Sequence, residues 1–552
     1  MIVFAVILFL TAFPVALVHA GNNRAVEGRH GMVVSENAYA THAGLEILEH
    51  GGNAIDAACA AELAIGVTNP GAAGLGGGGF MLVYLAKPHA FYALDFRETA
   101  PLRATPGMYL RNGKPDGKLA LIGPLAVGVP GEAAGIGAAL KRFGTIKFQR
   151  AAAEAETLAA NGYAASPHLA AEISENAAAL KRDPELRKIF FTRGGVPRKA
   201  GEPIRDTDLA ATLKKLGDDP AANFYHGPIA HRIAALMKSK GGIIGTADLA
   251  GYGPVWAAPL EREYHGYEVH VMPPPSSGGV LLEMLGMLAP GHLAGLGVNS
   301  PPYLARLIEV MRQGFIERNR YADPAFVHVP IAELLSDSHI AKLRDRALHG
   351  KTPPPTAAPA HDHGTSNLIV TDKDGNVVAL TSTINTAFGA KIAVPGLGII
   401  LNNEMDDFAV APGVPNVYRL EGAAANEIQP GKRPLSSMTP IIVTKNGRPV
   451  MSAGGSGGPL ILSGVLQVTL DILDFHLGAA GAVALPRIHE QAAPATVLAE
   501  DSMPAGTIRE LHQMGYDIRL VHALGAIDAI AIEPGNLRGA FDPRKGGGAA
   551  GY

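Results

Sequence analysis

The spacing of apolar and polar residues predicts a helix, a turn and a strand near the start of the chain. From about Ala40 to about Tyr84 an apolar helical pattern runs into a glycine-rich turn, and Phe80 to Tyr84 then has the pattern of a strand. Residues 125 to 320 are mostly helical in pattern, with alanine-rich amphipathic stretches such as 151 to 160 and 228 to 238. We expect these helices to form an outer layer.

A proline-rich segment near residue 350 separates this helical region from the clearest strand pair in the chain. Proline recurs between Lys351 and Pro359, and it can neither donate to a sheet nor continue a helix, so we expect an exposed linker. Strands are predicted at Asn367 to Asp372 and at Asn376 to Thr383, joined by Lys373-Asp374-Gly375. This pattern predicts a β-hairpin.

The length of the hairpin loop decides which side chains face each other. A three-residue loop, closed by glycine in the left-handed conformation, pairs Asp372 with Asn376. Counting outward, Thr365 then faces Thr383. A two-residue loop would place Thr365 opposite Ile384 and turn Thr383 to the other side, because side chains alternate along a strand. The Lys-Asp-Gly sequence favours the three-residue loop.

Composition and charge describe a folded protein of enzyme size. The 552 residues include 47% hydrophobic and 18% charged residues, with 67 glycines and 41 prolines, which is typical of a globular chain with many tight turns. This length fits several average domains or one large layered α/β unit. A net charge of -3 and a pI near 6.7 leave no extended basic surface, so we expect no nucleic-acid partner.

The N-terminal segment predicts export. Met1 to Ala20 are nearly all apolar and end in Val18-His19-Ala20, with small residues at the two positions that a signal peptidase reads. The segment lacks the usual Lys or Arg near its start, and an uncleaved membrane anchor is the alternative. We therefore expect a periplasmic or secreted protein. Its stability should come from packing, because the single cysteine, Cys59, lies in an apolar run and has no disulfide partner in the chain.

Two motifs match known binding sites by letter but fit better as structure. Gly74 to Gly79 satisfies the dinucleotide pattern GxGxxG, yet a strand follows the glycines where a phosphate-binding turn needs a helix N-terminus. Close backbone packing is therefore the preferred interpretation. His361-Asp362-His363 offers two zinc-type ligands without a third or fourth at a recognisable spacing, which favours a solvated loop.

The stretch Gly454 to Gly458 has two interpretations. It fits the GxSxG elbow of serine hydrolases, with Ser456 as nucleophile, a strand before it and a helix-like run after Pro459. A triad would also need an acid and a histidine, for which Asp471 or Asp474 and His489 are available. The interpretation that we favour uses the amides of Gly457 and Gly458, at the start of a helix, to bind a developing oxyanion.

Gly364-Thr365, directly after the linker, carries the main functional hypothesis. A threonine hydroxyl is a poor nucleophile unless a base lies beside it, and a free α-amine on the same residue is such a base, with a pKa near roughly 7.7 to 8. That amine exists only after the chain is cut before Thr365. Glycine at 364 leaves room for the hydroxyl to attack its own upstream carbonyl, and the linker lets the severed end move away.

Several long motifs occur in order along nearly the whole mature chain. They are Gly51 to Ala58, Gly74 to Phe80, Asp95 to Glu98, Pro273 to Gly279, Gly364 to Ser366, Thr383 to Thr386, Asn402 to Phe408, Lys432 to Met438 and Gly457-Gly458. Together they resemble the γ-glutamyltransferases (γ-glutamyltranspeptidases) of the N-terminal nucleophile hydrolase class. This resemblance turns the Gly364-Thr365 pair from an ordinary strand start into a candidate cleavage site.

The resemblance implies a role for each motif residue. Thr365 would be the nucleophile with Thr383 hydrogen-bonded to it, in agreement with the hairpin register. Arg97 would bind the substrate α-carboxylate, which a guanidinium matches with two hydrogen bonds. Glu404 and Asp407 would bind the α-ammonium, assisted by Asn385, Ser436 and Ser437. The amides of Gly457 and Gly458 would bind the oxyanion. Such a set recognises a zwitterionic amino-acid head.

The resemblance also extends to a lid. Ala409 to Gly431 resembles the lid of those family members that have one, with Tyr418 as the closing residue, and a lid would exclude water and sort acceptors. Departures from residues common in the family follow the nucleophile and the oxyanion glycines, at Asn367, Leu368, Pro459 and Leu460.

The fold and the processed form follow from the same resemblance. It implies an α+β fold, a four-layer αββα sandwich, consistent with the apolar strands near Thr365. After a signal peptide at 1–20, an N-to-O acyl shift and hydrolysis would give a large fragment, 21–364, and a small one, 365–552, joined as a heterodimer. The γ-glutamyl group of glutathione or a related amide would then move onto Thr365, and water, an amino acid or a dipeptide would release it. This chemistry needs no metal or organic cofactor.

Two alternatives stay open. One is a relative acting on glutaryl amides such as β-lactam side chains, or on γ-linked polyglutamate; a glutaryl acylase need not recognise an ammonium, so Glu404 and Asp407 argue against it. The other is a secreted binding protein that keeps the sandwich and never matures. The presence of Thr365, Thr383 and Arg97 together with Asp407 disfavours it.

Overall fold

The computed structural model describes residues 25–349, 364–411 and 413–552. The predicted leader, the proline-rich linker and the His361-Asp362-His363 motif lie outside the described residues. None of the helices in the described ranges combines the length and the apolarity needed to cross a membrane.

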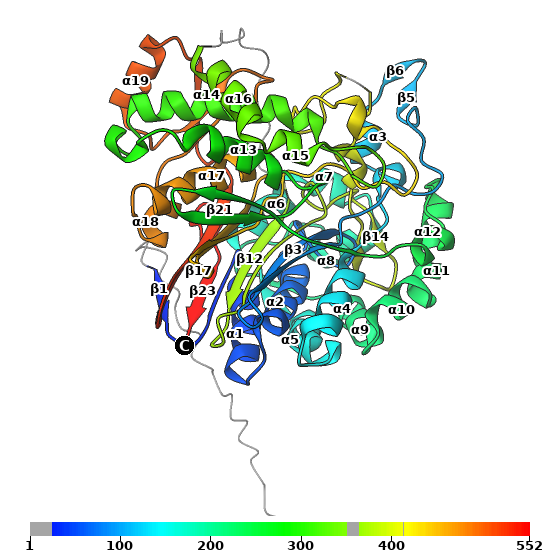
Figure 1. Ribbon diagram of the computed structural model, residues 1–552. Helices are drawn as coiled ribbons and strands as arrows, with labels where there is room; N and C mark the ends of the chain where they lie inside the picture. The colour runs from blue at the N-terminus through cyan, green and yellow to red at the C-terminus, as the bar shows by residue number, and fades with distance from the viewer. Residues whose placement is uncertain (1–24, 350–363, 412) are drawn as a thin grey trace, which may run out of the picture.

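Two seven-stranded antiparallel sheets form the centre of the molecule (Figure 1). The first sheet has the order β1 (Val26–Gly28), β22 (Asn536–Ala540), β21 (Ala526–Glu533), β17 (Arg448–Ser456), β16 (Ile441–Lys445), β11 (Tyr267–Val271) and β10 (Leu260–Tyr264). The second has the order β23 (Gly548–Gly551), β2 (Met32–Ser35), β12 (Ser366–Thr371), β13 (Val377–Thr383), β3 (Gly78–Leu85), β4 (Ala90–Asp95) and β9 (Val255–Ala257). Strands β12 and β13 pack against β17, so the two sheets lie face to face.

Helices cover the outer face of each sheet, as Figure 1 shows. On the second sheet lie α1 (Ala38–Glu49), α2 (Ala54–Thr68) and α4 (Glu132–Phe143), with α5 (Phe148–Asn161) packed on α2. On the first sheet lie α13 (Gly278–Leu288) and α17 (Leu460–Leu473), with α14 (Pro301–Glu317) and α16 (Asp337–His349) outside them. Each helical layer and its sheet enclose a large apolar core. This confirms the predicted αββα sandwich.

Segments from both sides of the Gly364-Thr365 bond alternate within the sheets. In the second sheet β12 and β13 lie between β2 and β3, and in the first sheet β16 pairs with β11. A cut before Thr365 would therefore leave two fragments held together by backbone hydrogen bonds and a shared core.

The hairpin has the register predicted from its loop. Asp372 N donates to Asn376 O at 3.1 Å, Gly375 has φ of 85°, and the pairing runs on to Ser366 opposite Ser382. The next pair outward is Thr365 and Thr383. The three-residue loop is confirmed, because a two-residue loop would have shifted every pair by one.

The start of the chain folds as predicted, with a close approach at the glycines. Helix α2 begins at a capping box between Asn53 and Asp56 and is buried on nearly all sides, which includes Cys59. A Cβ on Gly76 would lie 1.9 Å from Ile400 O, so backbone packing explains this glycine and the strand β3 follows it. No helix starts there, and the dinucleotide interpretation fails.

The helical prediction for residues 125 to 320 is right for its amphipathic stretches and incomplete elsewhere. Residues 151–160 lie in α5, and 228–238 lie in α11 (Pro228–Lys240). The prediction missed β9, β10 and β11. Strand β10 is a five-residue edge strand whose three central residues are all charged, and such a short run carries too little hydrophobic periodicity to be distinguished from a helix.

Candidate functional site

The predicted catalytic and substrate-binding residues other than Gly457 meet in one small pocket where β12 begins and β13 and β17 end. Its lining consists of Arg97, Thr365, Thr383, Asn385, Glu404, Asp407, Tyr418, Ser436, Ser437, Met438, Gly458 and Ile461. The free volume is about 20 Å³, which is little more than one water molecule needs. Residues from three distant parts of the chain thus converge on one nearly filled site.

The two threonine hydroxyls form a hydrogen-bonded pair. Thr365 Oγ1 and Thr383 Oγ1 are 3.1 Å apart, and both residues are buried. The amide of Asn385 donates to Thr383 Oγ1 at 2.8 Å, which fixes that hydroxyl. Thr383 therefore orients the Thr365 hydroxyl, while no histidine or carboxylate among the described residues contacts it to act as a base.

The backbone at the predicted cleavage site is strained. Thr365 has φ of 68° and Gly364 has φ of 70°. For a β-branched residue the left-handed region costs on the order of 1 to 3 kcal/mol and persists only where surrounding contacts impose it.

One of those contacts comes from Lys545. Its Nζ donates to Thr365 O at 2.6 Å and to Ser456 Oγ at 3.0 Å, and lies 2.8 Å from Glu36 Oε2. Sequence reasoning missed Lys545, because it lies 180 positions from Thr365 along the chain and no local pattern marks it.

Arg97 joins the two acidic residues predicted to bind the substrate ammonium. Its Nη1 lies 2.5 Å from Glu404 Oε1, its Nη2 lies 2.5 Å from Asp407 Oδ2, and its Nε donates to Pro434 O at 2.9 Å. Burial raises the pKa of Glu404 to about 8, although the charge of Arg97 acts in the opposite direction. The predicted carboxylate-binding and ammonium-binding groups therefore form one buried cluster.

The two serines are held by the segment Pro273 to Gly279. The amide of Ser436 donates to Pro275 O at 2.7 Å, and Ser277 Oγ donates to Ser436 O at 2.6 Å. The side chain of Ser437 lines the pocket and accepts from Arg318, a second residue that sequence reasoning missed.

The glycine pair between β17 and α17 has the backbone expected of an oxyanion pocket. Gly457 and Gly458 have φ of 123° and 58°, which favour glycine, and Pro459 precedes the first helical residue. A Cβ on Gly458 would lie 2.7 Å from the Tyr418 ring. The Tyr418 hydroxyl donates to Asn385 O at 3.1 Å, so the predicted lid residue closes over the glycines.

The serine-hydrolase interpretation fails on geometry. His489 Nδ1 lies 2.8 Å from Ser463 Oγ and its Nε2 lies 2.9 Å from Gln491 Oε1, while Ser456 Oγ contacts Lys545. Asp474 contacts Tyr264 and His265 at the far end of α17. The proposed triad members are thus engaged elsewhere.

Away from the pocket, one cluster in the described residues has ligands at metal-binding distances. Glu283, Glu317 and His339 offer atoms within 4.8 Å of one another. Arg320 and Arg346 already pair with Glu317 at 3.3 and 3.8 Å, which opposes a further cation there. The cluster is accounted for as an ion-pair network between α13, α14 and α16.

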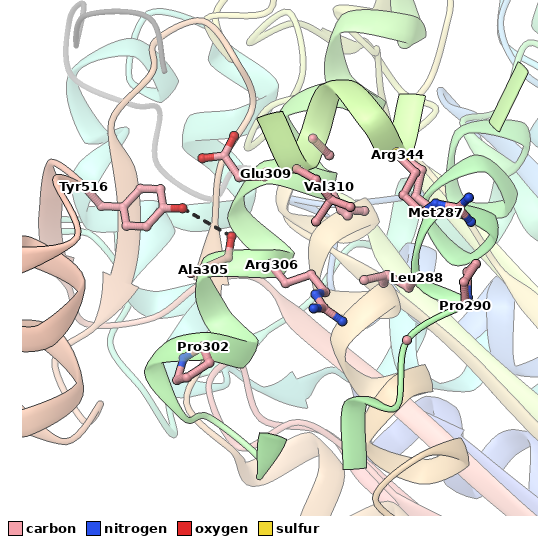
Figure 2. Close-up of a pocket in the computed structure, with 13 residues that line it drawn as sticks. Met287, Leu288, Pro290, Pro302, Ala305, Arg306, Glu309, Val310, Arg344 and Tyr516 are labelled. Carbon is pink, nitrogen blue, oxygen red and sulfur yellow. Dashed lines mark hydrogen bonds between the residues drawn. The ribbon is translucent and has the colours of Figure 1, made fainter. Parts of the chain in front are cut away.

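A larger cleft, of about 400 Å³, lies between α13, α14 and α16 (Figure 2). Apolar side chains such as Met287 and Val310 line it together with Arg306 and Arg344, and the Tyr516 hydroxyl donates to Ala305 O at its edge. None of the predicted site residues lines this cleft.

Comparison with known proteins gives the same assignment along the whole chain. The family model described as Gamma-glutamyltranspeptidase matches residues 40–552. The chain is 39% identical to the glutathione hydrolase proenzyme of Escherichia coli (strain K12), over 94% of this chain and 91% of that protein. It is 38% identical to the glutathione hydrolase proenzyme of Pseudomonas sp. (strain A14), over 99% of each. A solved cephalosporin acylase from Bacillus halodurans is similar with a TM-score of 0.86 at 27% identity, covering 98% of this chain and 99% of that chain.

Proposed function

The chain belongs to the gamma-glutamyltranspeptidase family, as an enzyme of the glutathione hydrolase type, and we propose that its nucleophile is Thr365, freed when the chain cuts itself after Gly364. The observation that carries the proposal is the pairing of the Thr365 and Thr383 hydroxyls at 3.1 Å in the pocket that Arg97 lines. The relatives' description as proenzymes supports the processing step.

Self-cleavage would proceed as an N-to-O acyl shift. The Thr365 hydroxyl oxygen attacks the Gly364 carbonyl carbon, the C–N bond breaks, and the hydroxyl proton ends on the new α-amine. Water then hydrolyses the ester and leaves a carboxylate on Gly364. The strained φ of Thr365 favours this direction, because that torsion angle no longer exists once the preceding peptide bond is broken.

Gly364→Ala should slow the cut by about tenfold or more. A Cβ at this position would lie 2.1 Å from Asn385 O, and φ of 70° disfavours any side chain. The fraction of full-length chain over time on a denaturing gel measures the effect. Gly375→Ala is the control, since Gly375 shares the positive φ but a Cβ there meets only Ala86, at 3.5 Å. Equal cleavage rates in Gly364→Ala and wild type would contradict the proposal.

The mature enzyme would use the same hydroxyl on its substrate. Thr365 Oγ1 attacks the γ-carbonyl of the donor while the α-amine takes the proton and then passes it to the leaving nitrogen. The amides of Gly457 and Gly458 stabilise the tetrahedral oxyanion. Water or the amine of an acceptor then releases the γ-glutamyl group from its threonine ester. Glutathione, other γ-glutamyl amides, and amino-acid or dipeptide acceptors fit this scheme.

Recognition of the α-ammonium distinguishes this function from a glutaryl acylase. The similarity to a solved cephalosporin acylase makes a glutaryl acylase the second candidate function. Glu98, Glu404 and Asp407 place three carboxyl groups within 4.0 Å of the single guanidinium of Arg97, so the cluster can accommodate a further positive charge. A glutaryl group has no such charge, and its binding would add a carboxylate to this buried site without adding a cation.

Paired donors test this assignment. We expect wild type to hydrolyse γ-glutamyl p-nitroanilide with kcat/KM at least about 100-fold above that for glutaryl p-nitroanilide, which lacks only the ammonium. Comparable values would favour the acylase function instead. Product analysis with glutathione, with and without a dipeptide, then separates hydrolysis from transfer.

Export is proposed from the apolar segment Met1 to Ala20. The large fragment of the exported protein would then begin near Gly21. A large fragment that still begins at Met1 would instead indicate a retained anchor.

A further inference from the structure

Arg318 is a buried cation that forms no ion pair with a carboxylate of the described residues. It lies directly after α14, with only 6% of the residue exposed, in a cavity that Asp407 also lines. Its Nε donates to Ser277 Oγ at 3.1 Å and its Nη2 donates to Ser437 Oγ at 3.3 Å. Within the described part of the chain no carboxylate oxygen comes within 4.0 Å of its guanidinium, whereas Arg97 has three such partners, Glu98, Glu404 and Asp407. Burial lowers the pKa of Arg318 to about 10, which leaves the group charged at neutral pH.

The hydrogen-bond directions fix what Ser277 and Ser437 can do. A guanidinium only donates, so both serine oxygens act as acceptors and each hydroxyl hydrogen must point elsewhere. Ser277 donates to Ser436 O. Ser437 Oγ makes no other hydrogen bond to a described residue, and its side chain lines the Thr365 pocket. Its hydroxyl hydrogen is therefore available to an anion in that pocket.

We propose that Arg318 is a positioning residue for the donor α-carboxylate: it orients the Ser437 hydroxyl as a donor and supplies the positive charge that this carboxylate balances. The inference rests on the proposed function. Arg97 already lies within 4.0 Å of three carboxyl groups, those of Glu98, Glu404 and Asp407, whereas Arg318 forms no ion pair with a described carboxylate. A bound α-carboxylate would therefore balance the buried charge of Arg318.

The test compares Arg318→Met with wild type on two donors. γ-Glutamyl p-nitroanilide carries the α-carboxylate, and 4-aminobutyryl p-nitroanilide lacks it. We expect Arg318→Met to raise KM for the first donor about 10- to 100-fold with kcat little changed, because the Ser437 hydroxyl is no longer held as a donor to the α-carboxylate and the charge that this carboxylate balances is lost. The variant should still be cut into two fragments, and kcat/KM for the second donor should stay at its wild-type value.

Controls separate positioning from a structural role. Arg320→Met removes an arginine that pairs with Glu317 and Glu333 and lines neither cavity, and its KM should match wild type. The melting temperature of Arg318→Met should not fall, since no buried carboxylate loses its partner. In a Ser437→Ala background, Arg318→Met should raise KM far less than in wild type, since it acts through that hydroxyl.

Clear outcomes would overturn the inference. An unchanged KM in Arg318→Met, an equal loss on both donors, or an undiminished effect in the Ser437→Ala background each removes the positioning role. If Arg318→Met does not fold, Arg318→Lys decides: it keeps the charge but not the paired donors, and an unchanged KM in it counts against the inference. Failure of the proposed function is recognised separately, because wild type itself would then not turn over γ-glutamyl p-nitroanilide.

Discussion

Thr365→Ala should remain a single full-length chain and lose its activity towards γ-glutamyl anilides by more than about 1,000-fold. The substitution removes the oxygen that attacks the Gly364 carbonyl, so the α-amine never forms and the mature enzyme lacks both its nucleophile and its base. A denaturing gel should show one band for the variant and two for wild type. N-terminal sequencing of the smaller wild-type band should begin at Thr365.

Thr365→Ser is the matched control for this result. Serine keeps the hydroxyl and, once cut, the α-amine, so the variant should mature and keep measurable activity. Melting temperature and gel filtration establish that Thr365→Ala is folded. An active wild-type enzyme in which residues 364 and 365 are still joined would overturn the mechanism. So would cleavage of Thr365→Ala at the same bond.

The part of this site that sequence predicts best is the part set by local turn chemistry. Lys373-Asp374-Gly375 determines a three-residue loop, the loop determines the register, and the register places Thr365 opposite Thr383. The loop is set by a short-range rule, and the register then follows by counting outward along both strands to a pair 18 positions apart. The layered fold followed from the family resemblance, since neither the hairpin nor the helical periodicity by itself specifies how two sheets stack.

The parts that sequence did not predict depend on long-range contacts. Lys545 reaches the Thr365 carbonyl from the C-terminal end of the chain, and Arg318 reaches Ser437 from the end of α14. Neither lysine nor arginine is unusual in its own segment. They reach the pocket only because the folded sandwich brings distant segments together. Arg318 differs from an ordinary surface arginine in that it is buried.

The close pairing of Arg97 with Glu404 and Asp407 was also not predicted from the sequence. The resemblance assigned Arg97 to the carboxylate and the two acids to the ammonium, as if the groups were separate. In the structure they share hydrogen bonds in one buried cluster.

Asp407→Asn should remove most of the donor preference of the mature enzyme. It keeps the shape of the side chain but removes the charge that would face the α-ammonium, so KM for γ-glutamyl p-nitroanilide should rise about 100-fold. Glutaryl p-nitroanilide has no ammonium, and its kcat/KM should stay level or rise. Cleavage after Gly364 should be unaffected, because Asp407 contacts Arg97 and neither threonine. The ratio of the two kcat/KM values is the measurement.

Asp406→Asn is the neighbouring control. Asp406 does not line the pocket and accepts a hydrogen bond from Val417 N at 3.0 Å. Burial raises its pKa to about 8, so the side chain is largely protonated at pH 7 and a neutral amide replaces a neutral acid. Its donor ratio should match wild type. If Asp407→Asn and Asp406→Asn change the ratio equally, or if Asp407→Asn leaves it unchanged, Asp407 does not bind the ammonium. The glutaryl acylase function would then be favoured again, because the charge match at this carboxylate was the argument against it.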